Sequence, residues 1–553
     1  MKYKASIPLA CSLIVVGFTI PKFLNLAIDV TVLISFFSQL GYVITYLSLL
    51  ICLITVIITF IWFPSVRRRF SSPIRHSGLS VMKLLLVTTI FIILLQIVIL
   101  FLVPNLLYQI AFYLFFISLI MFTIRSSVTF SGALLHKRRE RSDLHLKNLN
   151  RTPLVTVIVP AYNEEDAISK TVESLLTLSY PKKEIIIVDD GSTDGTLEVA
   201  RRFVDDNLVK LVSKPNGGKW DALNAGIREA QGEFIVCIDA DTLLDRDAIQ
   251  HLIKHFQDPR VAAVAGNVKV GNRTGILAKL QALEYVVGIN LHRRSEASLQ
   301  NVTVVPGPIG AFRVSVLKEI GLFEGDTFAE DADLTLKILK AGHKTVFDAT
   351  ACAYTEAPES MTSLAKQRYR WYRGSLQVLS KHRDLTFSRK HGRTGTFVMP
   401  WTVFNGVIFP WFMFFTMMWL LVFCFNPISP YTIYQPRIGG PPEWTSGPSS
   451  PSRGQGPSTP PTTQIGITID LFQTIPYIYV FWFFAFVLLE IAIAAYALSL
   501  DIKEKRSLLL YAGLYRLVYL YVVDIIRMLS QLEEVFHYPM KWEKLDHYGS
   551  VNV

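Results

Sequence analysis

Cysteine is scarce in this sequence, and charge is sparse. Five cysteines are spread over 553 residues without a Cys-x-x-Cys pair, which argues against a structural zinc site and against a disulfide framework. Charged residues make up 18% of the chain and hydrophobic residues 51%, which is less charge than a soluble protein of this size carries. The composition therefore favours a membrane protein.

Two long stretches contain no charged residue at all, Gln39–Phe63 and Leu84–Ile124. Because a membrane span needs about 20 apolar residues, the first stretch predicts one span. The second is interrupted by Pro104-Asn105 and predicts two. Together with an earlier apolar stretch at 5–36, these segments predict an N-terminal transmembrane region of about four helices, residues 1–130. A cleaved signal peptide fits less well, since several further spans follow.

Basic residues indicate the sides of these spans. Short Lys/Arg-rich segments at 66–76 and 134–147 follow predicted helices, and the positive-inside rule places both in the cytoplasm. Such segments explain the formal net charge of +11 without a nucleic-acid partner, and no basic stripe occurs elsewhere. We therefore expect a multi-pass α-helical protein of the cell membrane whose partner is the lipid bilayer.

Apolar segments return after residue 392. Residues 396–425 predict an interfacial helix leading into a span, and 475–531 predict further transmembrane or interfacial helices. The segment 426–470 is rich in Pro, Gly and Ser and predicts a disordered extracellular loop. Residues 532–553 form a tail.

The region between the membrane segments, residues 150–392, has the pattern of an α/β domain. Apolar β-branched runs alternate with helical segments. Polar residues follow three predicted strands: Asn163 and Glu164, then Asp190, then Asp239 and Asp241. Ligands of open α/β sheets bind beyond the carboxyl ends of the strands. A single Asp-Asp-Gly-Ser turn is equally consistent with a helix N-cap.

Asp239 and Asp241 form the strongest candidate for a metal site. Two carboxylates two residues apart at a strand end point to the same side and favour a hard cation, Mg²⁺ or Mn²⁺. Such a cation would neutralise charge on a nucleoside-diphosphate leaving group. Lys219, directly after two glycines, offers a point charge for phosphate oxygens. The alternatives are a solvated acidic turn and an ordinary surface lysine.

Six motifs occur in a familiar order: PAYNEE, DDGSTD, NGGKxxALNxGI, DAD, AED and QxxRW. Over nearly the whole cytosolic domain the chain resembles the processive, membrane-embedded polysaccharide synthases of glycosyltransferase family 2. Within that group, the stretch IDADTLLDRDAIQHLIKHFQDPRVAAVAGNVKV resembles the poly-N-acetylglucosamine synthases, with hyaluronan, chitin and cellulose synthases as relatives. The resemblance implies an inserted cytosolic GT-A domain that uses a UDP-sugar donor to extend a growing glycan acceptor.

The resemblance also implies roles for individual residues. Three residues are expected around the nucleotide base and ribose: Asn163, Glu164 and Asp190. Lys219 is expected to approach the diphosphate. The pair Asp239 and Asp241 corresponds to the DxD motif, with Asp241 as the more direct metal ligand.

Glu330 and Asp331 stand at the start of a predicted amphipathic helix. They are first-turn acids that favour the helix dipole, and the inward face of this helix is expected to carry Leu334, Ile338 and Leu339. An inverting sugar transfer needs a base for the attacking hydroxyl, and by resemblance this base is Asp331. The family's Thr-Glu-Asp is here Ala329-Glu-Asp, so any role of the threonine hydroxyl is lost. Glu330 is assigned to the acceptor side, and Asp333 is either a helper or a first-turn acid.

The QxxRW motif supplies Gln367, Arg370 and Trp371 on one helical face. An indole stacks well on the apolar face of a sugar, so these residues predict a collar that binds the acceptor at the mouth of a glycan channel. Arg368 and Arg373 lie outside the motif and are expected to face solvent or lipid headgroups. The segment 304–321 is expected to form a wall of the acceptor site, with Gly307 and Gly310 permitting close backbone approach.

Three functions fit the sequence to different degrees. The first is an inverting, processive synthase that polymerises a β-linked polysaccharide from a UDP-sugar, foremost UDP-N-acetylglucosamine, and translocates it. The second is a transferase that adds one sugar to a polyprenyl phosphate or glycolipid, for which QxxRW is superfluous. The third is a transporter with a non-catalytic nucleotide sensor. The tail 532–553 resembles a cytoplasmic tail of related synthases, and it stays cytoplasmic if 507–530 is interfacial rather than spanning.

Overall fold

The computed structural model describes residues 106–143, 152–204, 208–416, 471–501, 503–539 and 549–551. Predicted spans before residue 106, and the predicted loop at 426–470, lie outside the described residues. The chain divides into two compact units, Met1–Ile120 and Met121–Val553. Of the first unit, the structure describes only the beginning of helix α4 (Leu106–Asp143). This helix begins just after Pro104-Asn105 and continues beyond the predicted boundary at residue 130, through the basic segment.

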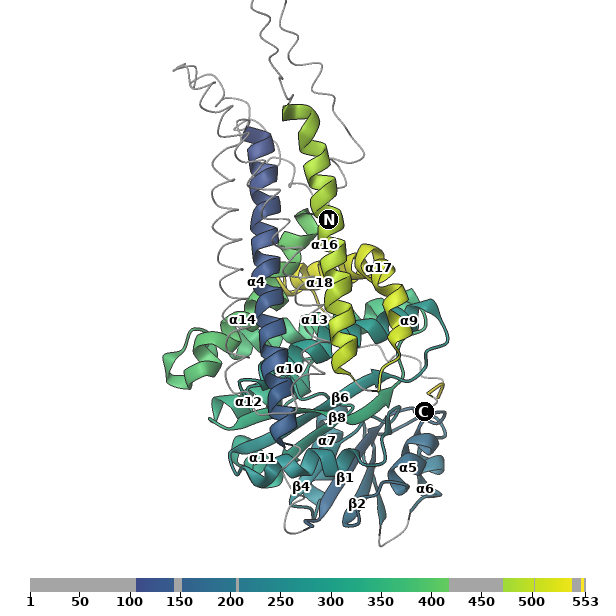
Figure 1. Ribbon diagram of the computed structural model, residues 1–553. Helices are drawn as coiled ribbons and strands as arrows, with labels where there is room; N and C mark the ends of the chain where they lie inside the picture. Colours follow the sequence, from purple (N-terminus) through teal and green to yellow (C-terminus); the bar gives the residue numbers. More distant parts are fainter. Residues whose placement is uncertain are drawn as a thin grey trace, which may run out of the picture. The chain divides into compact units, whose positions relative to one another are not determined.

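The second unit contains one eight-stranded sheet of order β3-β2-β1-β4-β7-β6-β8-β5 (Figure 1). Four neighbouring strands run parallel: β3 (Val209–Ser213), β2 (Lys183–Asp189), β1 (Val155–Ala161) and β4 (Phe234–Cys237). The other half contains β7 (Gly310–Arg313), β6 (Val261–Val270), β8 (Lys344–Thr355) and β5 (Leu243–Leu244). Strand β7 is antiparallel to both of its neighbours, β4 and β6. The predicted α/β domain is therefore confirmed.

Helices cover both faces of the sheet, because its strands are apolar on both sides. One face carries α5 (Ile168–Leu176), α8 (Ala248–Ile253) and α9 (Ile276–Glu284). The other carries α7 (Lys219–Glu229), α11 (Val314–Ile320) and α12 (Glu330–Lys340). Strand β1 shows the alternation of a pleated strand, since Val157 and Val159 pack in the first cluster and Ile158 in the second.

Close packing against the sheet depends on one glycine of α7. A Cβ at Gly226 would lie 2.6 Å from Cγ2 of Ile158, so only glycine allows α7 to approach β1 this closely. This contact matters because α7 begins at Lys219. Helix α6 (Thr196–Arg201) completes the region that follows β2.

A long helical segment widens in its middle. Helix α9 continues into a π-helix over Tyr285–Asn290 and then into α10 (Leu291–Ala297). Single π-helical turns within α-helices occur frequently at functional sites. The wide turn contains Tyr285, which is 5% exposed and packs in the core.

Three helices in the described part of the chain are long and apolar enough to cross a membrane: Ile117–Glu140, Thr394–Thr416 and Arg506–Val535. The second includes α14 (Met399–Val403) between two π-helical turns. Helix α16 (Leu471–Leu500) follows, and its segment Phe484–Leu500 is a shorter apolar helix.

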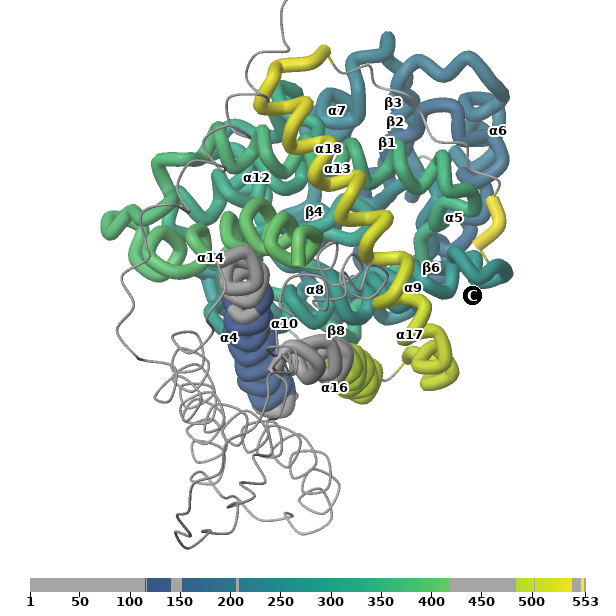
Figure 2. Tube along the Cα trace, turned by 90° about the horizontal axis from the view of Figure 1, so that it is seen from above, coloured from purple at the N-terminus to yellow at the C-terminus, as the bar shows by residue number. Residues whose placement is uncertain are grey.

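The third apolar segment begins and ends on the α/β domain. Just before it, Lys269 donates to Asp501 at 2.6 Å and Arg273 pairs with Glu504 at 2.7 Å. The segment then forms α17 (Ala512–Leu514), a π-helical turn and α18 (Leu520–Val535), which lies along α13 (Met361–Lys381) in Figure 2. At its far end, Arg373 of α13 binds Glu534 at 2.8 Å.

Residues 549–551 also lie on the α/β domain. Nζ of Lys170 donates to the carbonyl oxygen of Gly549 at 2.5 Å, and Oγ of Ser550 donates to Glu356 at 3.0 Å. Val551 is 4% exposed. These residues therefore join helix α5, which follows the polar loop after β1, to the end of strand β8.

Candidate active site

Polar loops follow the parallel strands at one edge of the sheet. Strands β1, β2 and β4 are parallel neighbours, so Asn163, Asp190 and Asp239 follow strand ends that meet at this edge. Asn163 has a φ of 55°, a left-handed conformation that asparagine tolerates. Its Oδ1 accepts a hydrogen bond from the backbone N–H of Thr193 at 2.7 Å, and its own N–H donates to Ser192 at 3.0 Å. These bonds join the loop after β1 to the loop after β2.

Asp190 organises the glycine-containing loop before α7. Its carboxylate accepts from the backbone N–H groups of Gly217 at 3.0 Å and Gly218 at 2.8 Å, and from Nζ of Lys214 at 2.6 Å. The sequence did not single out Lys214, because a lysine before a turn is an ordinary surface residue. By ordering this loop, Asp190 sets the point at which Lys219 begins its helix.

Lys219 lies between two acidic residues. Its Nζ is 2.5 Å from Oδ1 of Asp239 and 3.6 Å from Oε1 of Glu330. Burial lowers the pKa of Lys219, but the carboxylates of Asp239 and Glu330 more than offset burial and raise this pKa above its usual value. The lysine therefore stays protonated at the edge where a diphosphate is expected.

The two aspartates of the DxD pair have different surroundings. Asp239 faces Lys219, yet its Oδ1 is buried without a hydrogen bond of standard geometry. Asp241 is 9% exposed and lies 3.4 Å from Oγ1 of Thr355 at the end of β8. Carboxylate oxygens are suitable ligands for a hard divalent cation, and both aspartates follow the end of β4.

Asp331 sits at the start of α12, close to this pair. Its Oδ2 accepts from the backbone N–H of Gly307 at 3.3 Å and its Oδ1 from that of Ala332 at 2.8 Å. Burial, aided by the neighbouring carboxylate of Glu330, raises the pKa of Asp331 to about 6. At neutral pH the side chain is mostly ionised but retains enough basicity to accept a proton.

Gly307 brings the lysine, the DxD pair and the helix start together. A Cβ at Gly307 would lie 2.6 Å from Nζ of Lys219 and 3.2 Å from Oδ1 of Asp239. The predicted close backbone approach at this glycine is therefore present. The helix beyond Asp331 faces inward as predicted, with three side chains nearly inaccessible: Leu334 at 1%, Ile338 at 0% and Leu339 at 2% exposed.

Helix α13 carries the QxxRW residues next to this cluster. The rings of Trp371 and Tyr285 have centroids 6.4 Å apart. Gln367 accepts a hydrogen bond from Arg368, and Arg370 is half-buried, with no ion pair to any other described residue. A Cβ at Gly374 would lie 2.9 Å from the Cβ of Ala329, so α13 touches the residue that precedes Glu330 and Asp331.

The prediction that Arg368 and Arg373 face solvent or lipid is wrong. Arg368 is 0% exposed, and its Nε donates to Glu284 of α9 at 3.2 Å. Arg373 is 3% exposed and binds Glu534 of α18. Both arginines are counterions of carboxylates far away in sequence, so the helix itself gave no sign of their burial. They hold α13 between α9 and α18.

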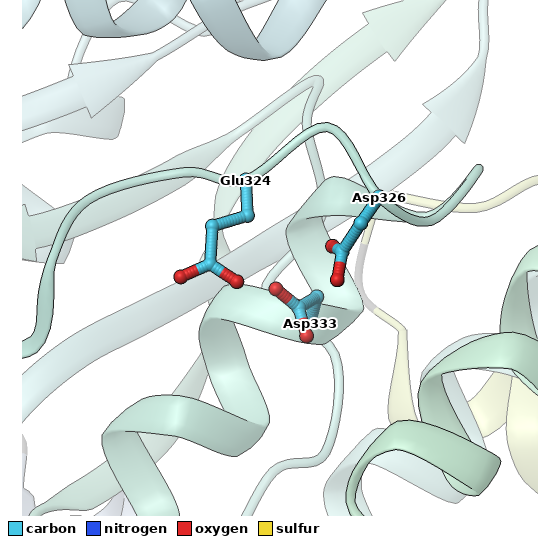
Figure 3. Close-up of side chains that lie close together, drawn as sticks. All are labelled: Glu324, Asp326 and Asp333. Atoms are coloured by element: carbon cyan, nitrogen blue, oxygen red, sulfur yellow. The ribbon is translucent and has the colours of Figure 1, made fainter.

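Three acidic side chains gather beside the first turn of α12: Glu324, Asp326 and Asp333 (Figure 3). Their carboxylate oxygens lie within 4.8 Å of one another, a spacing that would suit a metal ion. However, Nζ of Lys381 binds all three, at 2.6, 2.7 and 3.0 Å. Asp333 also binds His382 at 2.7 Å. The ammonium group therefore already supplies the cation, and Asp333 anchors α13 instead of assisting Asp331.

Parts of the chain are similar to known glycosyltransferases. Residues 156–321 match the family described as glycosyl transferase family 2. The chain is 33% identical over 252 residues to a poly-beta-1,6-N-acetyl-D-glucosamine synthase of Staphylococcus aureus, a match that covers 45% of this chain and 60% of that protein. It is 35% identical over 227 residues to the synthase of the same name from Staphylococcus epidermidis, covering 41% and 55%. The chain thus spans 60% or less of the length of these relatives.

Among solved structures, the chain is similar to a mannosyltransferase from Pyrobaculum calidifontis in complex with GDP-Man and Mn²⁺. The TM-score is 0.49 at 20% identity, and the match covers 77% of this chain and 100% of that one.

Proposed function

We propose that this chain is an inverting, processive polysaccharide synthase. The premise is that it is a family 2 glycosyltransferase of GT-A-like α/β fold, the family whose model matches residues 156–321. Its donor is a UDP-sugar, foremost UDP-N-acetylglucosamine, and its product is a β-linked glycan that it translocates across the membrane. The observation that carries the proposal is the convergence of Lys219, Asp239 and Asp331 around the backbone of Gly307.

The donor is held at the carboxyl edge of the parallel strands. Asn163, Glu164 and Asp190 lie on loops that are joined by hydrogen bonds, which supports their assignment to the nucleotide base and ribose. Lys219 moves from Asp239 to the diphosphate, because two phosphates carry more negative charge than one carboxylate. Asp239 and Asp241 would hold Mg²⁺ or Mn²⁺, which supplies positive charge to the diphosphate leaving group.

Asp331 acts as the base. A hydroxyl of the acceptor attacks C1 of the donor sugar from the face opposite the diphosphate, so the new C–O bond forms as the bond to UDP breaks. Asp331 takes the hydroxyl proton and later releases it to water. Its pKa of about 6 suits this task, since the carboxylate is ionised at neutral pH and basic enough to accept a proton.

Helix α13 is positioned to hold the acceptor. Trp371 packs against the guanidinium of Arg368, 4.2 Å from the indole centroid, and its ring centroid lies 6.4 Å from that of Tyr285. A rigid indole provides a flat apolar surface for successive sugar rings. Glu330, Gln367 and Arg370 complete the proposed acceptor side. The apolar helix Thr394–Thr416 is the next long helix after α13 and supports a path from this collar into the membrane.

The contacts of the C-terminal region support a definite topology. Asp501 and Glu504, before the last apolar segment, and Glu534, at its end, all bind the α/β domain. A segment that starts and ends on one soluble domain does not cross a membrane. Residues 506–535 are therefore interfacial, with Leu510, 86% exposed, on the lipid side. Residues 549–551 then lie in the cytosol with the catalytic domain.

The experiment is incubation of the purified full chain with each labelled UDP-sugar, followed by sizing of the product. Long chains from UDP-N-acetylglucosamine are expected, and Asp331→Asn should abolish them. Lipids bearing one sugar would instead identify a single-addition transferase. If no UDP-sugar is consumed while UDP still binds, the α/β domain is a sensor and the proposal fails.

A further inference from the structure

Arg293 is a buried arginine to which the proposed chemistry assigns no task. It lies on α10, directly after the π-helical turn that contains Tyr285. Its side chain is 9% exposed, and Nη1 is buried with no hydrogen-bond partner among the described residues. Leaving a buried charged donor unpaired costs several kcal/mol, on the order of the penalty for breaking a buried ion pair. Such a group is expected to have a partner that arrives with a ligand.

The neighbouring arginine, Arg294, forms hydrogen bonds that serve the fold alone. Arg294 is 3% exposed, and its guanidinium binds Glu140 at 2.5 Å and the carbonyl oxygen of Leu500 at 3.2 Å. Both residues stand on one short helix, yet only Arg294 has its hydrogen-bonding capacity used by the fold. The contrast distinguishes Arg294, which stabilises the fold, from Arg293, whose Nη1 is available to a ligand.

Two carboxylates act on the charge of Arg293, and one of them is the proposed base. Burial lowers the pKa of Arg293 to about 10, and Asp331 is the carboxylate that most strongly opposes this effect, ahead of Glu296. Glu296 is occupied, since its carboxylate accepts from the N–H of Thr303 at 3.1 Å and from its hydroxyl at 2.7 Å. These bonds join α10 to the segment that leads to Gly307, whose N–H donates to Asp331 at 3.3 Å, so Arg293 belongs to the surroundings of the proposed base.

Tyr285 connects this arginine to the acceptor side. Its ring lies 6.4 Å from that of Trp371, centroid to centroid. Burial raises the pKa of Tyr285 to about 12, so its hydroxyl stays protonated, and the charges that act on it include Arg293 and Asp241. The charges of Arg293 and Asp241 thus both act on Tyr285, whose ring lies beside Trp371 of α13.

We propose that Arg293 binds the terminal sugar of the acceptor by donating a hydrogen bond from Nη1 to a hydroxyl or carbonyl oxygen of that sugar. This proposal rests on the proposed function. The donor diphosphate already has Lys219, whose Nζ lies 2.5 Å from Oδ1 of Asp239. A neutral sugar beside Asp331 has oxygens that can accept a hydrogen bond from Arg293, and it has no positive charge that would repel the guanidinium. By fixing this sugar, Arg293 orients the attacking hydroxyl toward the carboxylate of Asp331.

The test measures separate Michaelis constants for donor and acceptor. Purified Arg293→Gln is assayed with UDP-N-acetylglucosamine and a soluble N-acetylglucosamine oligomer, together with slow hydrolysis of the donor in the absence of acceptor. The acceptor KM is expected to rise about 10- to 100-fold, the loss of one charged hydrogen bond. Donor KM and donor hydrolysis should stay within about twofold. Arg293→Lys, which keeps a charged donor, should recover part of the acceptor affinity.

Arg294→Gln is the matched control, because it removes a buried guanidinium from the same helix. It should lower the unfolding temperature and leave the acceptor KM unchanged. An unchanged acceptor KM in Arg293→Gln, or a rise in the donor KM alone, would overturn the proposal, the latter by assigning Arg293 to the donor sugar. Where Arg293→Gln does not fold, Arg293→Lys decides in the same assay. Failure of wild type to consume any UDP-sugar would instead refute the proposed function.

Discussion

Arg368 of α13 and Glu284 of α9 form an ion pair in the interior of the second unit, with Nε of the arginine 3.2 Å from Oε1 of the glutamate. Arg368 is 0% exposed, and Cζ of its guanidinium lies over the ring of Trp371, 4.2 Å from the ring centroid. The hydroxyl of Tyr519 donates to the same glutamate at 2.6 Å. The indole of QxxRW is therefore fixed by the arginine that lies between the motif positions.

Arg368→Met should destabilise the protein strongly. It leaves the carboxylate of Glu284 buried without its counterion, which costs about 3–5 kcal/mol. The measurement is thermal unfolding of the purified protein. The double variant Arg368→Met/Glu284→Leu should regain much of the loss, because no charge is then left unpaired. Arg389→Met, at an exposed position, should change stability by no more than about 0.5 kcal/mol.

Activity should fall on the acid side as Asp331 takes up a proton. Because the pKa of this group is raised to about 6, kcat/KM should rise with pH through this value and level off above it. Glu330→Gln removes a neighbouring negative charge that contributes to the raised pKa, so the acid limb should move to lower pH. A limb that moves upward, or stays in place, would contradict the assignment of the base.

Asp331→Asn should be inactive yet at least as stable as the wild type. A carboxylate whose pKa is higher in the folded protein than in the unfolded chain weakens folding progressively as pH rises through the folded value. The amide removes this penalty above pH 6. The unfolding temperature at pH 8 should therefore not decrease. A decrease would mean that the hydrogen bonds to Gly307 and Ala332 outweigh the buried charge.

Chelation of divalent metal should abolish activity, and Asp241→Asn should reduce it by about 100-fold or more, since a bound cation contributes several kcal/mol to such transfers. The titration of activity with Mn²⁺ after EDTA treatment measures both effects. Asp326→Asn is the control, because its acidic cluster is bound by Lys381. Full activity in EDTA would remove the metal from the mechanism.

Single cysteines at Ser507 and Phe536, in a background without the native cysteines, should react with an impermeant maleimide from the same face of sealed vesicles. Both positions are exposed, and they flank α17 and α18. Labelling from opposite faces would show that residues 506–535 cross the membrane.

Much of the α/β domain could be predicted because its signals are local. The apolar runs of β1, β2 and β4 and the acids after them are visible in sequence, and parallel strands bring their ends to one edge. The inward face of α12 follows from helical spacing. Each of these inferences needs only neighbouring residues.

The partners of buried charges could not be predicted, because they come from distant elements. Glu284 is 84 residues from Arg368, and Glu534 is 161 residues from Arg373. The sequence of α13 alone does not distinguish an arginine in a buried ion pair from an arginine on the surface. The same reason applies to Lys381, whose three carboxylates turn an apparent metal cluster into an anchor.

The contacts of residues 549–551 have a consequence for biosynthesis. Lys170 and Glu356 emerge from the ribosome long before Gly549 and Ser550, which they bind. A nascent chain can therefore contain every strand of the sheet while the helix after the β1 loop still lacks these contacts. The final packing at this place occurs only after residues 549–551 have been made, so it follows the synthesis of the sheet and of helix α18.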